Sequence, residues 1–168
     1  WCAFPETLKP LFAKSCQYGS SIYSCAPVPI QYATQELLEN KDLCKTYIER
    51  TKTLYSHVIK EIMPFLDNTK LKYPGIESSW YVYLDFKSYK EGLNKIGVQD
   101  SVQLSHHLMV NYHILTVAAQ HFGDDSLSLR FSLVDFEFDL EKEDIKNVNT
   151  ANMKEGFQKL CSFLDSLE

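Results

Sequence analysis

A lone arginine among serines is the first feature of this sequence that has the chemistry to bind a ligand. In the stretch "SLSLRFSLVDFEF" (126–138), apolar residues alternate with polar ones from Ser126 to Leu133. A period of two predicts a β-strand with one apolar and one polar face, and Arg130 falls on the polar face. Its planar set of N–H donors can bind a carboxylate with two parallel hydrogen bonds. The alternative is an arginine that is simply hydrated on the surface of a strand.

The other arginine and the histidines form weaker patterns. Arg50, next to Glu49, falls on the polar side of a predicted helix, where a surface role explains it. His106 and His107 are neighbours on a predicted helix and point about 100° apart, so they do not share a face. No cysteine or carboxylate stands at metal-ligand spacing from them, and we therefore expect solvated or capping histidines and no metal site.

The cysteines and lysines offer no clear nucleophile. The five cysteines are odd in number, widely spread and without a CxxC pair: Cys2, Cys16, Cys25, Cys44 and Cys161. This pattern predicts reduced thiols in a cytoplasmic protein rather than a disulfide framework or a zinc site. Lys14 lies on a predicted helix face, and we do not expect it to form a Schiff base, because such an amine must be desolvated.

Composition excludes several classes of function. The chain has 168 residues, 45% of them hydrophobic and 13% aromatic, which predicts about one globular domain. The net charge is −5 and no basic run occurs, so a nucleic-acid surface is not expected. No apolar stretch approaches the roughly 20 residues that span a bilayer, and no signal-peptide pattern opens the chain. We expect no membrane partner and a cytoplasmic location.

Helices and strands alternate along the chain. The helices are expected from Pro5 with Leu8, Leu11 and Phe12 on one face; from Pro29 to 40; over 42–66, ended or bent by Pro64; near 88–96; from an Asp100–Gln103 capping box to about Tyr112; and around Met153, Phe157, Leu160 and Leu164. Loops are expected over 18–29 and in the acidic segment 134–149, which we interpret as a solvated connection. Strands are expected over 79–86, 113–119 and 127–134.

These elements predict an α/β (α+β) fold with a small mixed or antiparallel sheet covered by helices. In the strand 79–86, Trp80, Val82, Leu84 and Phe86 fall on one face, and Tyr81, Tyr83 and Asp85 fall on the other. The chain opens at Trp1 within "WCAF", which reads as strand sequence, and we interpret it as a piece of a longer protein.

Three stretches, in this order, resemble the C-terminal part of the class I/II aminotransferases, pyridoxal-phosphate (PLP) enzymes of the aspartate aminotransferase type. "WCAFPETLKPLFAKSCQYGSSIYSCAPVPIQYAT" is similar to the segment that follows the family's lysine motif. "YPGIESSWYVYLDF" resembles the strand Pro-x-Gly-Gly-Phe-Tyr-x-Trp, which lies near the substrate pocket of the family. The resemblance therefore implies that Trp80 and Tyr81 are candidates to line a substrate site, although a core role explains Trp80 at least as well. "ILTVAAQHFGDDSLSLRFSL" resembles the final block, in which a strand contains Arg-Leu-Ser.

The resemblance implies that residues 1–168 are a single domain, the small C-terminal domain of a fold-type-I PLP enzyme. The Schiff-base lysine and the phosphate-binding arginine of the family lie upstream of the segment that matches "WCAFPE". The chain would therefore lack the large domain, and alone it would bind no PLP and be inactive. The complete enzyme, a homodimer, would transfer an amino group between an amino acid and a 2-oxo acid. Arg130 matches the family arginine that binds the substrate's α-carboxylate.

Two alternatives stay open. The same fold serves carbon–sulfur lyases, synthases and decarboxylases, whose reaction is set by residues upstream of this chain. A non-catalytic interaction domain that kept the fold is the other possibility. In each case we expect the chain, separated from a large domain, to expose an apolar patch and to self-associate.

Overall fold

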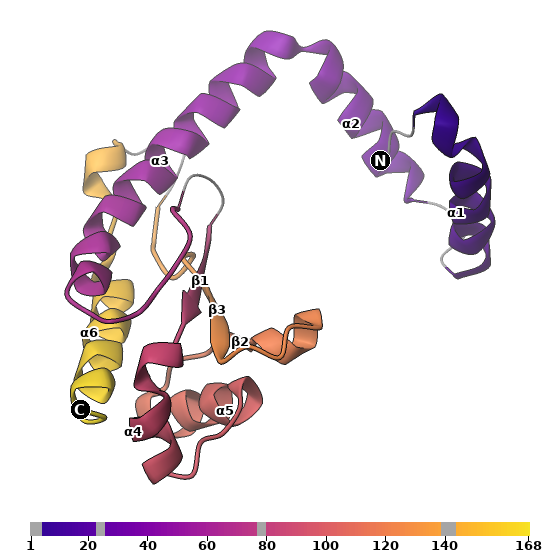
Figure 1. The fold of residues 1–168 in the computed structure, drawn as a ribbon. Helices are drawn as coiled ribbons and strands as arrows, with labels where there is room; N and C mark the ends of the chain where they lie inside the picture. Colours follow the sequence, from indigo (N-terminus) through magenta and orange to yellow (C-terminus); the bar gives the residue numbers. More distant parts are fainter. Residues whose placement is uncertain (1–4, 23–25, 77–79, 139–143) are drawn as a thin grey trace. The chain divides into compact units, whose positions relative to one another are not determined.

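The computed structural model describes residues 5–22, 26–76, 80–138 and 144–168, without the side chain of Lys146 (Figure 1). The strand expected at 1–4 lies outside these residues. The chain divides into two compact units, Trp1–Ile48 and Glu49–Glu168, which we call the N-terminal and the C-terminal unit and describe separately.

The N-terminal unit is helical in its described part. A 3₁₀ turn, η1 (Glu6–Leu8), leads into α1 (Lys9–Ile22), and α2 (Val28–Glu39) precedes the first turns of α3 (Lys41–Asp67). The prediction of Pro29 in the first turn of α2 is confirmed. The loop expected from residue 18 is wrong up to Ile22, because the hydroxyls of Ser20 and Ser21 donate to the Gln17 carbonyl inside the helix.

Helix α3 buries the second part of the apolar stripe that a period of 3.6 predicts, which comprises Leu43, Tyr47, Leu54, Val58, Ile62 and Leu66. Leu54, Val58, Ile62 and Leu66 are buried at a spacing of four residues. Leu43 and Tyr47 are exposed, so the prediction is wrong for the start of the helix. Pro64 does not end the helix, which continues to Asp67. Two carbonyls of the last turn accept hydrogen bonds from side chains that follow the helix. The Asn68 side-chain amide donates to Pro64 O at 2.8 Å, and the Thr69 hydroxyl donates to Leu66 O at 2.8 Å.

The sheet of the C-terminal unit has three antiparallel strands in the order β1-β3-β2 (Figure 1). Strand β3 (Ser128–Ser132) lies between β1 (Tyr81–Asp85) and the short β2 (Val117–Ala118). It pairs Leu129 with Leu84 of β1 and with Ala118 of β2. The predicted α+β class with a small antiparallel sheet is thereby confirmed.

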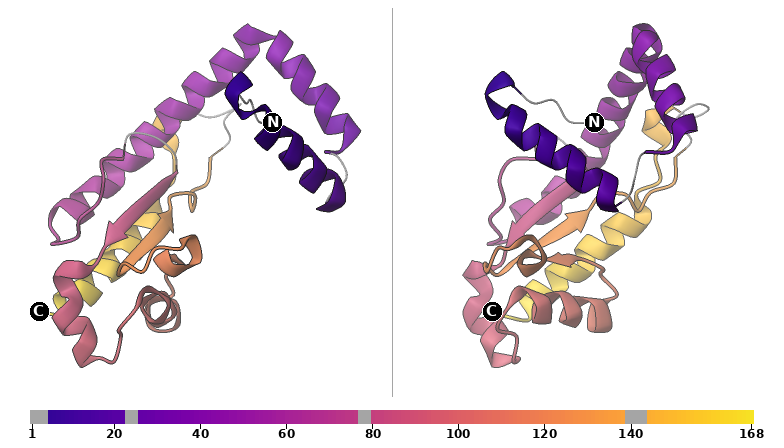
Figure 2. Two further views of the ribbon diagram at one scale, coloured as in Figure 1. Left: turned by 45° about the vertical axis from the view of Figure 1, so that its right-hand side comes forward. Right: turned by 90° about the vertical axis from the view of Figure 1, so that its right-hand side faces the viewer.

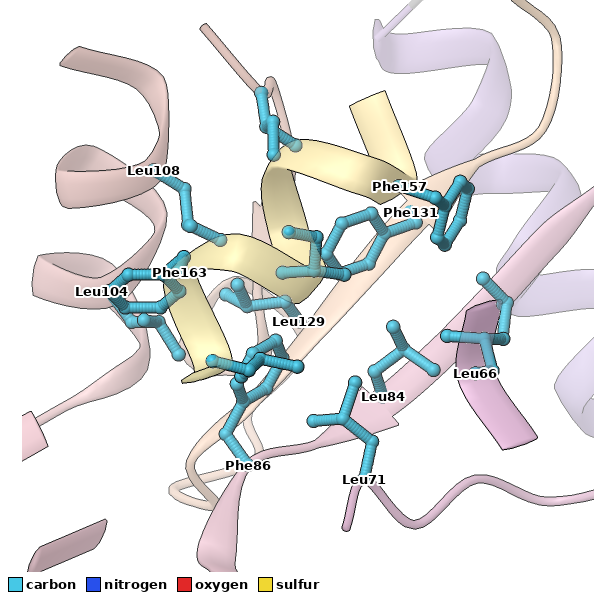
Figure 3. Packing of buried hydrophobic residues seen from close by; sticks show 14 of the residues in the cluster. Leu66, Leu71, Leu84, Phe86, Leu104, Leu108, Leu129, Phe131, Phe157 and Phe163 are labelled. Carbon is cyan, nitrogen blue, oxygen red and sulfur yellow. The ribbon is translucent and has the colours of Figure 1, made fainter. Parts of the chain in front are cut away.

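The core packs against one face of this sheet. Figure 3 shows Leu84 and Leu129 from the strands close to Leu66 of α3 and to Phe163 of α6 (Ala151–Asp165). Leu104 and Leu108 of α5 (Ser101–Tyr112) extend the cluster. In both views of Figure 2, α6 runs beside the strands. Burying such side chains stabilises the fold by roughly 1.5–3 kcal/mol each.

The start of α5 is predicted well and the segment after it is not. Asp100 Oδ1 accepts from the Gln103 backbone N–H at 2.8 Å, which confirms the N-cap, while Gln103 Oε1 accepts from Gln99 N–H. The strand expected over 113–119 shrinks to two residues. His113 takes a left-handed conformation (φ 59°) as the cap of α5, and Ile114 N–H donates back to Leu108 O.

Two further connections position the sheet. A 3₁₀ turn, η2 (Lys87–Tyr89), and α4 (Lys90–Lys95) follow β1 where a short helix is expected. After β2 the chain forms η3 (Ala119–Phe122) and turns at Gly123, whose φ of 75° suits glycine.

The acidic segment 134–149 is more than a solvated connection. Glu137 pairs with Asn149 in an isolated bridge, and a 3₁₀ turn, η4, spans Ile145–Asn147. Its apolar side chains Phe136, Phe138, Ile145 and Val148 pack half-buried against the core. The interpretation as a solvated connection is therefore wrong for these residues, and it falls outside the described residues for 139–143. None of the helices that the structure describes has the length and apolar character needed to cross a bilayer.

Two helical glycines give a test of this packing. A Cβ on Gly92 of α4 would collide with the Leu167 carbonyl oxygen and lie 2.8 Å from Leu167 Cβ, whereas a Cβ on Gly156 of α6 meets no atom within 4 Å. We expect Gly92→Ala to lower the free energy of unfolding by about 1–3 kcal/mol. Gly156→Ala should raise it by about 0.5–1 kcal/mol, since alanine favours the helix. Urea unfolding followed by circular dichroism measures both, and equal effects would contradict the described packing.

Candidate functional site

Arg130 lies on the central strand, on the face of the sheet opposite the core. Leu129 and Phe131 on either side of it are buried, while Arg130 itself is half-buried. Its backbone pairs with Tyr83 of β1 and with Val117 of β2. The predicted alternation along this strand is confirmed.

Two aromatic rings cover the guanidinium. Arg130 Cζ lies 4.2 Å from the centre of the Tyr81 ring and 4.8 Å from the centre of the Phe122 ring. A cation over a ring face is attracted by about 0.5–1 kcal/mol at an exposed position and by about 2 kcal/mol when desolvated. Tyr81 is a residue that the sequence indicated, whereas Phe122 was missed.

No acidic side chain among the described residues forms an ion pair with Arg130. The described contacts of the guanidinium are the two rings, which accept no strong hydrogen bond from its N–H groups. The planar set of donors is therefore available for an anion, and a carboxylate is the partner that matches its geometry.

An aspartate on the same face is occupied by other donors. Asp124 Oδ2 accepts from the Tyr83 hydroxyl at 2.6 Å and from the Ser126 hydroxyl at 2.8 Å, and Asp124 Oδ1 accepts from Ser126 N–H at 2.9 Å. Ser126 Oγ lies 2.8 Å from Ser128 Oγ of β3. These hydrogen bonds fix the Asp124 carboxylate next to the hydroxyl of Tyr83, whose backbone pairs with that of Arg130 across the strands.

The same contacts shift two pKa values. Burial, and then the hydrogen bond to Asp124, raise the pKa of the Tyr83 hydroxyl. The Tyr83 hydroxyl, followed by the Ser126 backbone and side chain, lowers the pKa of the Asp124 carboxyl. Both shifts favour a neutral tyrosine that donates to an anionic aspartate.

Further aromatic side chains continue the surface beside Tyr81. The Trp80 ring centre lies 5.7 Å from that of Tyr81 and 5.9 Å from that of Tyr55 on α3. Trp80 is 43% exposed, unlike Val82 and Leu84, so a buried core role for Trp80 is wrong. Its carbonyl accepts from the Leu133 N–H at 2.7 Å, so the pairing with β3 begins one residue before the first residue of β1.

The other residues singled out from the sequence lie apart from this site or carry no visible chemistry. Lys14 is exposed on α1, His106 is exposed on α5, and the His107 ring packs 5.4 Å from Phe163. The described residues contain no group of three or more metal-ligating side chains. Cys16, Cys44 and Cys161 are free thiols, and burial raises the pKa of Cys161. Cys2 and Cys25 lie outside the described residues.

Comparison with known proteins does not identify the chain. No protein-family model matches it, and none of the curated proteins matches it significantly.

The Tyr83–Asp124 pair gives a pH-dependent prediction. The raised pKa of Tyr83 contributes stability below about pH 10, which is lost as the pH rises above the unfolded value. The lowered pKa of Asp124 contributes stability above about pH 4, which is lost as the pH falls toward the folded value. Tyr83→Phe should therefore destabilise the chain most at pH 5–9 and little near pH 2–3, as measured by urea unfolding.

Tyr73→Phe is the matched control for this measurement. Tyr73 also has a raised pKa and donates to an aspartate, Asp67, at 2.9 Å, but neither residue contacts the Arg130 rings. Tyr73→Phe removes a tyrosine hydroxyl with a raised pKa at another place in the fold, and should leave the NMR signal of the Arg130 side chain unchanged. A Tyr83→Phe effect that is independent of pH would refute the assigned hydrogen bond.

Proposed function

We propose that Arg130 binds the α-carboxylate of an amino-acid or 2-oxo-acid substrate, and that this chain is the small C-terminal domain of a PLP-dependent aminotransferase. The observation that carries the proposal is the guanidinium on the open face of the central strand, held by Tyr81 and Phe122 and without an acidic partner among the described residues. The sequence resemblance supplies the reaction. The α+β fold and the small antiparallel sheet are compatible with it.

Arg130 would act by orientation. Two parallel hydrogen bonds to the α-carboxylate fix the position and the plane of this group. Holding a substrate in one reactive geometry removes much of the entropy cost of reaction. The rings contribute by restricting the arginine, so that its donors are aimed before the substrate arrives.

The described residues alone do not fit the cofactor. None of the described lysine side chains is buried, whereas a Schiff-base lysine is desolvated. The proposal therefore assigns PLP to residues outside this chain, in a large domain that would also complete a homodimer. A carbon–sulfur lyase, synthase or decarboxylase of the same fold would use Arg130 in the same way.

The carboxylate site is testable on this chain by NMR. The sequence contains only two arginines, Arg50 and Arg130, so ¹⁵N-labelled protein gives two arginine Nε–H signals. We expect acetate and pyruvate to shift the Arg130 signal in a saturable way, and methylammonium not to shift it. In variants at position 130, which lack the Arg130 signal, the backbone amide signals of β3 report the titration. Arg130→Gln should weaken binding about tenfold or more, because a charged hydrogen-bonded pair is lost, and Arg130→Lys should weaken it several-fold.

Arg50→Gln is the matched control for the titration. It should leave the affinity unchanged and identify the Arg50 signal, which serves as an internal reference. Carboxylate binding that survives Arg130→Gln would show that the anion binds elsewhere and would overturn the assignment of Arg130.

The aminotransferase reaction is tested on the longer protein from which we propose this chain comes. Treatment with PLP and then borohydride should add one pyridoxyl group to a lysine upstream of residue 1. In that protein Arg130→Gln should raise KM for the amino acid strongly. A folded protein that takes up no PLP would instead support a non-catalytic interaction domain. An active protein whose KM is unchanged by Arg130→Gln would overturn the role of Arg130 in binding the substrate.

A further inference from the structure

The rings at Arg130 come from opposite sides of the central strand. Tyr81 belongs to β1, and Phe122 ends η3, which follows β2, so the two residues flank β3 in the order β1-β3-β2. Their ring centres lie 4.2 and 4.8 Å from Arg130 Cζ. An anion that reaches the N–H groups must therefore approach beside one or both rings.

These rings are exposed to an extent that a core role does not explain. Tyr81 is 37%, Trp80 43% and Phe122 51% exposed, while the large apolar side chains of the core are almost fully buried. Trp80 and Tyr81 lie in ring contact, so the aromatic surface continues outward from Arg130 along β1. Clustered exposed apolar side chains are a common mark of binding surfaces.

Charge on the same face opposes a second anionic group. Asp124 is held by the hydroxyl of Tyr83, whose backbone pairs with Arg130, and its carboxylate is anionic at neutral pH. A ligand that carries a second carboxylate near this position would be repelled. Rejection of an alternative ligand by a like charge is a usual source of specificity.

We propose that the site at Arg130 selects monocarboxylates that carry an aromatic or other flat apolar group close to the carboxylate, over small aliphatic acids and over dicarboxylates. The inference rests on the proposed role of Arg130 and adds the class of ligand. The carboxylate meets the guanidinium, and the apolar group lies against Tyr81, Phe122 or Trp80. A favourable aromatic contact with burial of the ring improves affinity by about tenfold.

The test compares three acids on the full chain by the same arginine Nε–H signal: 3-phenylpropanoate, propanoate and butanedioate. We expect 3-phenylpropanoate to bind about tenfold more tightly than propanoate, and butanedioate to bind no more tightly than propanoate. Phe122→Leu and Tyr81→Leu should each weaken the binding of both acids, since the rings also restrict the arginine, and should reduce the preference for the phenyl acid over propanoate several-fold. Leucine keeps an apolar group at an exposed position, so these variants should fold.

Met109→Ala, at an exposed position on α5, is the control and should keep the full preference. Equal affinities for 3-phenylpropanoate and propanoate, or tighter binding of butanedioate, would overturn the selectivity while leaving Arg130 as a carboxylate site. A preference that persists in both leucine variants would also overturn it, because the phenyl group would then bind elsewhere. If no carboxylate shifts the Arg130 signal, the proposed function itself fails.

Discussion

The alternation of side chains along β3 is the constraint on which the site depends. This strand is hydrogen-bonded on both sides, to β1 and to β2, so its register and its two faces are fixed from two directions. Leu129 and Phe131 are held in the core, and the residue between them must point the other way. A shift by one residue would bury Arg130 and expose both apolar neighbours, which the packing of α3, α5 and α6 does not permit.

Arg130 has no acidic partner among the residues that the structure describes, and such a cation needs other stabilising contacts, because a desolvated charge is costly. Arg130 is only half-buried, so part of its hydration is retained, and two ring faces supply attraction without occupying its donors. The Asp124 carboxylate accepts from the Tyr83 hydroxyl and from Ser126, and forms no ion pair with Arg130. The arrangement preserves the guanidinium for an external anion.

The sequence predicted the parts of the structure that local periodicity determines. The paired strands β1 and β3, the apolar stripe of α3 and the N-cap of α5 follow from spacing that a single segment contains. The position of Phe122 does not, because it depends on the turn at Gly123 and on how η3 returns to the sheet. The predicted strand that contains β2 is too long for a related reason. The backbone N–H groups of His113 and Ile114 donate to Leu108 O and cap α5, although strand propensity alone predicts that these residues pair with β3. The assignment of residues 1–168 to one domain stays a prediction.

The short length of β2 affects the tendency of the protein to aggregate through the edge of its sheet. An edge strand exposes unpaired backbone N–H and C=O groups, and a long edge is a template for a strand of another molecule. Here the edge is two residues long, with a left-handed residue and a threonine tied to Ser105 before it and a 3₁₀ turn after it. The left-handed residue and the 3₁₀ turn limit how far the extended edge can continue on either side. The same helix cap that shortened the strand thus protects this side of the sheet from edge-to-edge aggregation.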